Sequence, residues 1–185
     1  RADRETARRQ PQRQALSEAP VEAGRCGDNA ERRHPEPRLN PVTNLSSPTS
    51  AALRLGHAGL LPFVIGAALV WLVRPDAHPY VTAALSAYAA VIVSFLGGIH
   101  WGFAMRQADA PASLAGWGVV PSLVAWVAVV MPPYAGLVVQ GAMLVACYLV
   151  DRRVYPAQGA AGWLTLRFRL TAVASLSCFI GAAGS

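Results

Sequence analysis

The residues best suited to chemistry in this sequence lie within apolar segments. His100 stands in the run FLGGIHWGFAM. There an imidazole could hydrogen-bond a neighbouring helix, relay a proton during transport or, together with His57, ligate a haem. Arg167 lies near the start of another apolar run with Thr171 one turn further on, and the two could hold a lipid phosphate or pair with Asp151. Because ionisable groups are costly in lipid, we expect them to face other helices.

Five apolar segments must position these residues. Crossing a bilayer as a helix takes about 20 apolar residues. Runs of this kind cover residues 55–73, 80–105, 113–131, 134–150 and 163–183. Pro62 and Pro121 lie inside two of these runs and predict kinks. The Pro132-Pro133 break is so short that the third and fourth spans should form an antiparallel hairpin. The predicted fold class is all-α, an integral membrane bundle of five transmembrane helices over residues 53–185.

The N-terminal part, residues 1–52, is predicted to be a disordered tail rich in Arg and Pro. Its first 50 residues carry nine Arg, seven Asp or Glu and no aromatic residue, and their few large apolar residues show no period. Such a segment cannot bury enough apolar surface to offset the entropy lost on ordering. Its acidic residues argue against a mitochondrial transit peptide, and no apolar core of a secretory signal occurs before Leu53.

Arginine positions predict the orientation in the membrane. With the N-terminus inside, the inner segments hold six arginines and the outer segments only Arg74. The six are Arg54, Arg106, Arg152, Arg153, Arg167 and Arg169. We therefore expect a bacterial inner-membrane protein with a cytoplasmic N-terminus and an outside C-terminus, the mitochondrial inner membrane being the alternative. The bilayer is the expected partner, and a membrane protein or a second copy of the chain is open. No basic stripe interleaved with aromatic residues indicates nucleic-acid binding, despite the net charge of +6.

Small residues in the second span predict close helix packing. They recur every four residues and form one ridge along a helix, which lets another helix approach. The ridge comprises Ser86, Ala90, Ser94, Gly98 and Gly102. His100 lies on a different face, together with Ala89, Val93, Gly97 and Ala104. In the fourth span Gln140 is expected to donate an interhelical hydrogen bond.

The remaining motifs point away from catalysis. Cys147 and Cys178 lie within apolar runs without a metal-binding spacing, so they are expected to be small buried hydrophobes. The sequence contains no nucleophile elbow, P-loop, HExxH or paired-carboxylate arrangement. We therefore expect no enzymatic activity, no metal and no cofactor.

A family resemblance is carried by four segments: LGHAGLLPF, AYAAVIVSFLGGIHWGFAM, VVPSLVAW and LTLRFRLT. They resemble a family of uncharacterised multi-pass membrane proteins that includes bacterial inner-membrane members and the transmembrane protein 69 group of mitochondria. The resemblance implies the five-helix membrane fold and brings no established activity. The family-signature positions that it implies are Gly98, His100, Trp101, Gly102, Pro121, Arg167 and Thr171.

The expected function is that of a non-enzymatic structural or assembly-type component of the inner membrane. The alternative is a small transporter or proton-coupled carrier that uses a polar cluster around His100 and Arg167. This candidate cluster is drawn from the inner-leaflet ends of the spans and comprises His57, His100, Trp101, Asp151, Arg167 and Thr171. Within it, we expect a neutral His100 to meet a polar group of the fifth span, either Arg167 or Thr171.

Overall fold

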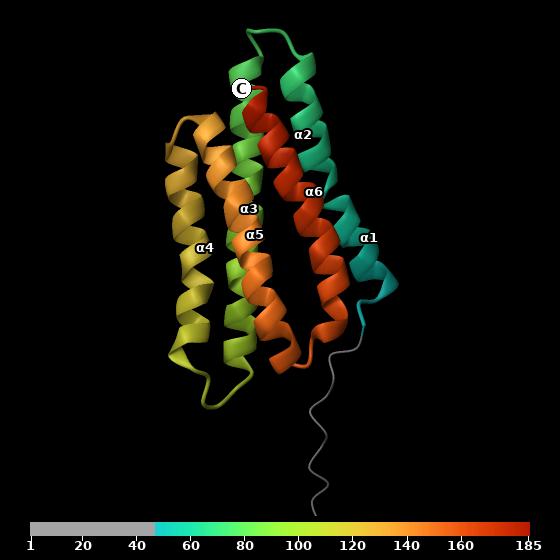
Figure 1. Cartoon of the computed structure of the whole chain (residues 1–185), viewed down its shortest axis with the longest axis vertical. Helices are drawn as coiled ribbons and strands as arrows, with labels where there is room; N and C mark the ends of the chain where they lie inside the picture. The colour runs from blue at the N-terminus through green and yellow to red at the C-terminus, as the bar shows by residue number, and fades with distance from the viewer. Residues whose placement is uncertain (1–46) are drawn as a thin grey trace, which may run out of the picture. The chain divides into compact units, whose positions relative to one another are not determined.

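The computed structural model describes residues 47–185, which are helical apart from short connections and contain no strand (Figure 1). The helices are α1 (Ser50–Ala58), α2 (Leu61–Leu72), α3 (His78–Met105), α4 (Ala112–Val130), α5 (Pro133–Ala157), the short 3₁₀-helix η1 (Ala161–Trp163) and α6 (Leu164–Ala183). Five units are long and apolar enough to cross a membrane, which confirms the predicted five-helix fold: Ser50–Leu72, His78–Met105, Ala112–Val130, Pro133–Ala157 and Ala161–Ala183. The predicted tail lies outside the described residues as far as residue 46, and α1 begins within its last residues, at Ser50.

The first span is broken into two helices by Pro62. Proline has no backbone N–H, so it cannot donate to the carbonyl of Ala58, where α1 ends. The chain turns through Gly59 and Leu60 before α2 begins. The Tyr88 hydroxyl of α3 donates to the Gly59 carbonyl oxygen at 2.7 Å, which satisfies a backbone group at the break. Instead of the kink expected at Pro62, the span is divided into two helices, and the Tyr88 side chain of α3 stabilises the turn between them.

Prolines and one glycine set the other helix ends. Pro79 and Pro133 stand in the first turns of α3 and α5, where a missing N–H costs nothing. After α5 the chain reverses through Gly159, whose φ of 71° is a conformation that side-chain-bearing residues rarely adopt. The Ala160 amide then donates to the Tyr155 carbonyl at 2.8 Å, and η1 leads into α6. This tight reversal places α6 beside α5.

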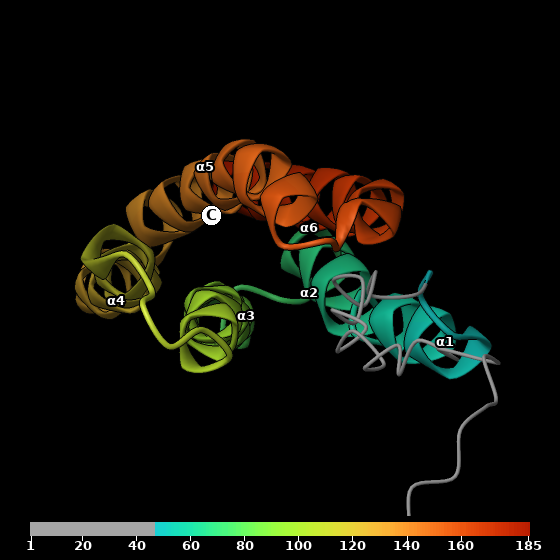
Figure 2. The same ribbon diagram turned by 90° about the horizontal axis from the view of Figure 1, so that it is seen from below.

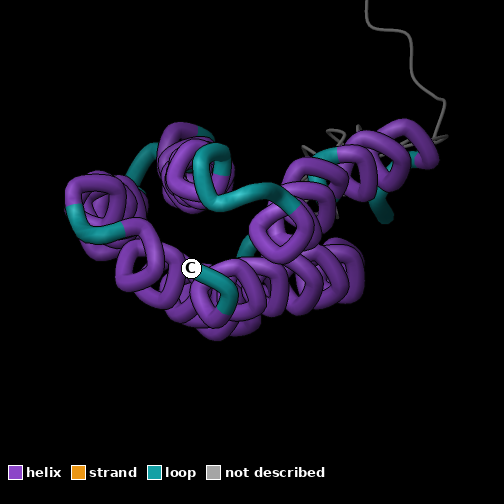
Figure 3. Tube along the Cα trace, turned by 90° about the horizontal axis from the view of Figure 1, so that it is seen from above, coloured by secondary structure: helices purple, strands orange, loops and turns teal. Residues whose placement is uncertain are grey.

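Helices α3 and α6 each have several packing neighbours. Helix α3 packs against α2, α4 and α5, and α6 packs against α5 and α2. Seen from below, α5 and α6 form a continuous layer, and α3 and α2 lie along one side of it (Figure 2). The view from above shows the loops confined to the helix ends (Figure 3). We call the end where α1, α4 and α6 begin and α3 and α5 finish the lower end of the bundle, as it is drawn in Figure 1.

Two close approaches between helix backbones require glycine. A methyl group at Gly97 of α3 would overlap the carbonyl oxygen of Gly118 in α4, so these helices touch backbone to backbone. A methyl group at Gly136 of α5 would likewise overlap the carbonyl oxygen of Ala128 in α4. The second contact closes the hairpin predicted from Pro132-Pro133.

The predicted small-residue ridge is wrong at its lower half. Ser86 is buried, but Gly98 and Gly102 are exposed, and a methyl group on either would meet no atom within 4 Å. Four residues turn an α-helix by about 400°, so a four-residue repeat drifts by about 40° per step and winds out of the contact face. The contact face is instead the one that carries His100. On it Ala89, Val93 and Gly97 are all buried.

Candidate functional site

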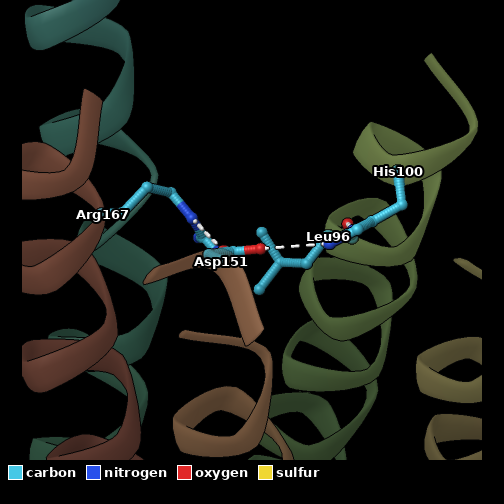
Figure 4. Close-up of polar contacts among 4 residues, drawn as sticks. All are labelled: Leu96, His100, Asp151 and Arg167. Carbon is cyan, nitrogen blue, oxygen red and sulfur yellow. Dashed lines mark hydrogen bonds and ion pairs between the residues drawn. The ribbon is translucent and has the colours of Figure 1, made fainter. Parts of the chain in front are cut away.

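Three ionisable side chains from three helices meet inside the lower half of the bundle. Asp151 of α5 lies between Arg167 of α6 and His100 of α3 (Figure 4). Asp151 and His100 are each 1% exposed and Arg167 is 7% exposed. The cluster is thus shielded by the chain itself from the surroundings of the bundle.

The guanidinium of Arg167 pairs with one oxygen of the Asp151 carboxylate. Its Nε donates to Oδ2 at 2.8 Å, and its Nη2 donates to the same oxygen. A buried charge is tolerated when it is paired and hydrogen-bonded, and each of these residues supplies the partner that the other needs. The pairing with Asp151, one of the two roles considered for Arg167, is confirmed.

The second carboxylate oxygen of Asp151 faces His100. His100 Nε2 lies 3.4 Å from Asp151 Oδ1, and its Nδ1 lies 3.3 Å from the backbone carbonyl of Leu96, one turn earlier in α3. Both atoms that face the ring are acceptors, whereas a neutral imidazole has a single N–H to give. Neither His100 Nε2 nor Asp151 Oδ1 makes a hydrogen bond to residues 47–185, so the two groups face each other without being hydrogen-bonded.

This geometry corrects the partner predicted for His100. The sequence predicts a polar group from the fifth span beside His100, but the group beside Nε2 belongs to the fourth span, and Asp151 lies between His100 and Arg167. The difference arises because α5 continues past Val150 to Ala157, through residues that resemble a polar break. Asp151 and Tyr155, four residues apart, point inward on this extension, while Arg152 and Arg153 point outward.

Two members of the predicted cluster lie elsewhere. His57 is on an exposed face of α1, and its Nδ1 lies 2.7 Å from the Leu53 carbonyl of its own helix. Trp101 follows His100 in sequence but turns away from the cluster, with its indole against Gly118 of α4. The next residue on a helix lies about 100° round the axis, so a neighbour of a buried residue commonly faces outward. Thr171 does join the cluster's surroundings, one turn after Arg167 and 5% exposed.

A second polar contact lies nearer the middle of the bundle. Gln140 of α5 is fully buried, and its Nε2 donates to Ser86 Oγ of α3 at 3.4 Å, as predicted. The Oε1 atom of the same side chain has no hydrogen-bond partner. The expected burial of Cys147 and Cys178 is also confirmed. These residues pack the bundle and present no reactive group to a ligand.

A partly open cavity of about 380 Å³ adjoins the cluster. It lies between α1, the start of α2, α3, α5 and the lower part of α6, and its walls are almost wholly apolar. Tyr155, Trp163, Arg167 and Thr171 supply the side chains with polar groups, whereas His100 and Asp151 do not line it. No pattern in the sequence predicts this cavity, because it depends on the angle at which α1 leaves the bundle. Within residues 47–185 no group of three His, Cys, Asp or Glu residues could hold a metal ion.

The five membrane-crossing helices and their buried ion-pair network define a multi-pass helical membrane protein. Residues 48–183 match the model of the family described as "Protein of unknown function (DUF3429)", and the chain belongs to that family. It is also similar to transmembrane protein 69 of Xenopus tropicalis, with 42% identity over 92 residues. This similarity covers 47% of the chain and about a third, 35%, of that relative. No solved structure matches the chain.

Proposed function

We propose that the protein is a non-enzymatic structural or assembly-type component of its membrane. The observation that carries this proposal is the closed network of His100, Asp151 and Arg167. Its polar groups face one another across three helices, and His100 and Asp151 do not line the cavity beside Arg167. A network of this kind fixes the relative positions of α3, α5 and α6. A rigid bundle with an apolar outer surface suits contact with lipid and with other membrane helices.

Cross-linking in living cells tests the assembly role. A photoreactive amino acid would replace Trp126 of α4 or Phe168 of α6, both of which are exposed apolar residues. A structural component should give a discrete cross-linked product, either with a second copy or with another membrane protein. Placing the same amino acid at the buried Leu137, which does not line the cavity, provides the control, since it should cross-link only within the chain. The absence of any intermolecular product from either exposed position would contradict the assembly role.

A proton-coupled carrier is the second candidate, favoured by the fact that Arg167 touches both the network and the cavity. Purified protein in liposomes with an internal pH-sensitive dye separates the two functions. A structural protein should pass protons no faster than protein-free liposomes after a pH jump. A proton flux that is abolished by His100→Gln and preserved by Trp126→Leu would overturn the structural proposal in favour of the carrier.

The proposed setting is the bacterial inner membrane, with the lower end of the bundle facing the cytoplasm. The arginine distribution supports this orientation, because the lower end holds all the span-flanking arginines except Arg74. Single cysteines at Ala108, in the α3–α4 loop, and at Ser185 test it in intact cells, with Cys26 replaced by serine. A membrane-impermeant maleimide should label position 185 and leave position 108 unlabelled. The reverse pattern would contradict the orientation.

A further inference from the structure

The cavity beside Arg167 opens sideways from the bundle. Leu55 of α1 and Phe95 of α3 line it, although these side chains are 73% and 64% exposed, so they form the rim of its mouth. Seen from below, α1 points away from α3 (Figure 2), and residues of both helices line the cavity. Both rim residues belong to membrane-crossing units and are apolar, so the surroundings of the mouth are the hydrocarbon of the bilayer. An occupant can enter from the membrane without crossing water.

The shape and lining of the cavity fit a hydrocarbon chain. Its volume of about 380 Å³ falls in the range of small-molecule sites. On α6 the lining runs from Leu166 to Ala174, a rise of about 12 Å along the helix. Leu60, Ile99 and Leu170 contribute further apolar wall. The cavity is thus elongated along the direction in which lipid chains lie.

One polar group inside the cavity has no hydrogen-bond partner among the residues that the structure describes. Thr171 Oγ1 is buried, lines the cavity and makes no hydrogen bond. A helical threonine usually donates to the carbonyl one turn earlier, and an unmet hydroxyl in an apolar medium is costly. The neighbouring Arg167 is already neutralised by Asp151. An uncharged acceptor such as an ester carbonyl would therefore satisfy Thr171 without disturbing the ion pair.

Charge at the lower end of the bundle selects the headgroup. Within residues 47–185, five exposed arginines and one exposed acidic residue, Asp109, lie there. The arginines are Arg54, Arg106, Arg152, Arg153 and Arg169. Arg54 lies on α1 between the cavity-lining residues Ala52 and Leu55. Basic residues near a membrane surface attract anionic headgroups.

We propose that this cavity binds an anionic phospholipid. One acyl chain fills the apolar space between α1, α3 and α6, its ester carbonyl accepts a hydrogen bond from Thr171 Oγ1, and the phosphate lies toward Arg54. The site does not depend on whether the protein is an assembly component or a carrier, because both would retain the cavity.

Native mass spectrometry of the chain released from nanodiscs tests the site. The nanodiscs would contain equal amounts of phosphatidylglycerol and phosphatidylcholine. The wild-type chain should retain phosphatidylglycerol in preference to phosphatidylcholine. Thr171→Val, which keeps the side-chain shape and removes the hydroxyl, should weaken retention roughly 2- to 10-fold. Arg54→Gln should lower the preference for the anionic lipid roughly 5-fold.

A matched pair of glycine variants identifies the location. Gly56 lines the cavity and its nearest neighbour is the flexible end of Leu170, so Gly56→Leu should fill the space and abolish retention. Gly98→Leu makes the same change on an open face and should retain lipid as the wild type does. Melting temperatures in detergent check that both variants fold. Equal lipid retention in Gly56→Leu and Gly98→Leu would overturn the proposal, as would a wild-type chain that carries an uncharged prenyl compound or no lipid.

Discussion

Arg167 donates twice to a single oxygen of Asp151, and this leaves the other oxygen facing His100. The carboxylate of Asp151 therefore contacts two helices, α6 through Arg167 and α3 through His100. Each neighbour depends on Asp151, while His100 and Arg167 are linked only through it. Asp151 is thus the residue whose loss should disturb the bundle most.

Replacing Asp151 should destabilise the protein strongly. Asp151→Asn leaves the Arg167 charge buried without a counter-charge, and breaking a buried pair in this way costs about 3–5 kcal/mol. Thermal unfolding in detergent measures the change. The double variant Asp151→Leu/Arg167→Met removes both charges and should be more stable than Asp151→Asn alone. Arg169→Gln, at an exposed position two residues from Arg167, is the control and should leave the melting temperature unchanged.

The contribution of His100 should depend on Asp151. His100→Leu removes the ring nitrogen that lies 3.4 Å from Asp151 Oδ1, and because no hydrogen bond joins the two atoms the expected cost is about 1 kcal/mol. In a chain that already carries Asp151→Leu there is no oxygen to satisfy, so the same replacement should cost much less. A double-mutant cycle from unfolding in detergent measures this coupling. Equal costs in the two backgrounds would mean that the contact between the two side chains contributes nothing.

Adjacent glycines in α3 should respond in opposite ways. Gly97→Ala forces a methyl group against the Gly118 carbonyl and should cost about 1–3 kcal/mol through overpacking. Gly98→Ala points into open space and should be neutral or stabilising by up to about 1 kcal/mol, because alanine is the better helix former. Melting temperatures of the two purified variants decide the matter. A larger loss at Gly98 than at Gly97 would show that the exposed face is the real seam.

The Gln140 hydrogen bond should matter little. Gln140 Nε2 donates to Ser86 Oγ over a long distance of 3.4 Å, and Gln140 Oε1 has no hydrogen-bond partner among the described residues. The amide group therefore contributes little to the free energy of unfolding. Interhelical hydrogen bonds in membrane proteins average about 0.6 kcal/mol. Gln140→Met should therefore change the free energy of unfolding by less than about 1 kcal/mol. A loss comparable with that of Asp151→Asn would indicate that Gln140 has a further partner.

Tyr88 should restrain the break in the first span. Tyr88→Phe keeps the ring packed against Phe63 and removes only the hydroxyl that donates to Gly59. The expected cost is about 0.5–1.5 kcal/mol, together with faster hydrogen exchange of the amides around Gly59. Exchange should stay unchanged in α4, which packs against α3 and α5 at the other side of the bundle. Unchanged exchange around Gly59 would mean that packing alone holds the break.

The sequence predicts the membrane spans and their breaks, because these depend on composition along the chain. It predicts less well which side chains share a helix face, because this depends on rotation about the helix axis. The spans follow from runs of about 20 apolar residues, and Pro62 marks the break of the first. The predicted ridge in α3 leaves the contact face because a four-residue repeat turns about 40° too far at each step. The two arginines after Asp151 favour a helix end there, yet the side chains of Arg152 and Arg153 point outward and the helix continues. The cavity requires the angle of α1, which no local pattern specifies.

The pairing of Asp151 with Arg167 bears on how the chain enters its membrane. Taken singly, α5 would bring an acidic residue and α6 a basic one into hydrocarbon, and each such residue adds up to about 3 kcal/mol to the insertion free energy at the helix centre. The two residues are only 16 positions apart, across the tight reversal at Gly159. They can therefore neutralise each other before the first three spans take part. During synthesis α5 and α6 should partition into the bilayer together as one hairpin in which Asp151 and Arg167 neutralise each other, and a nascent chain truncated after α5 should insert less efficiently than one that includes α6.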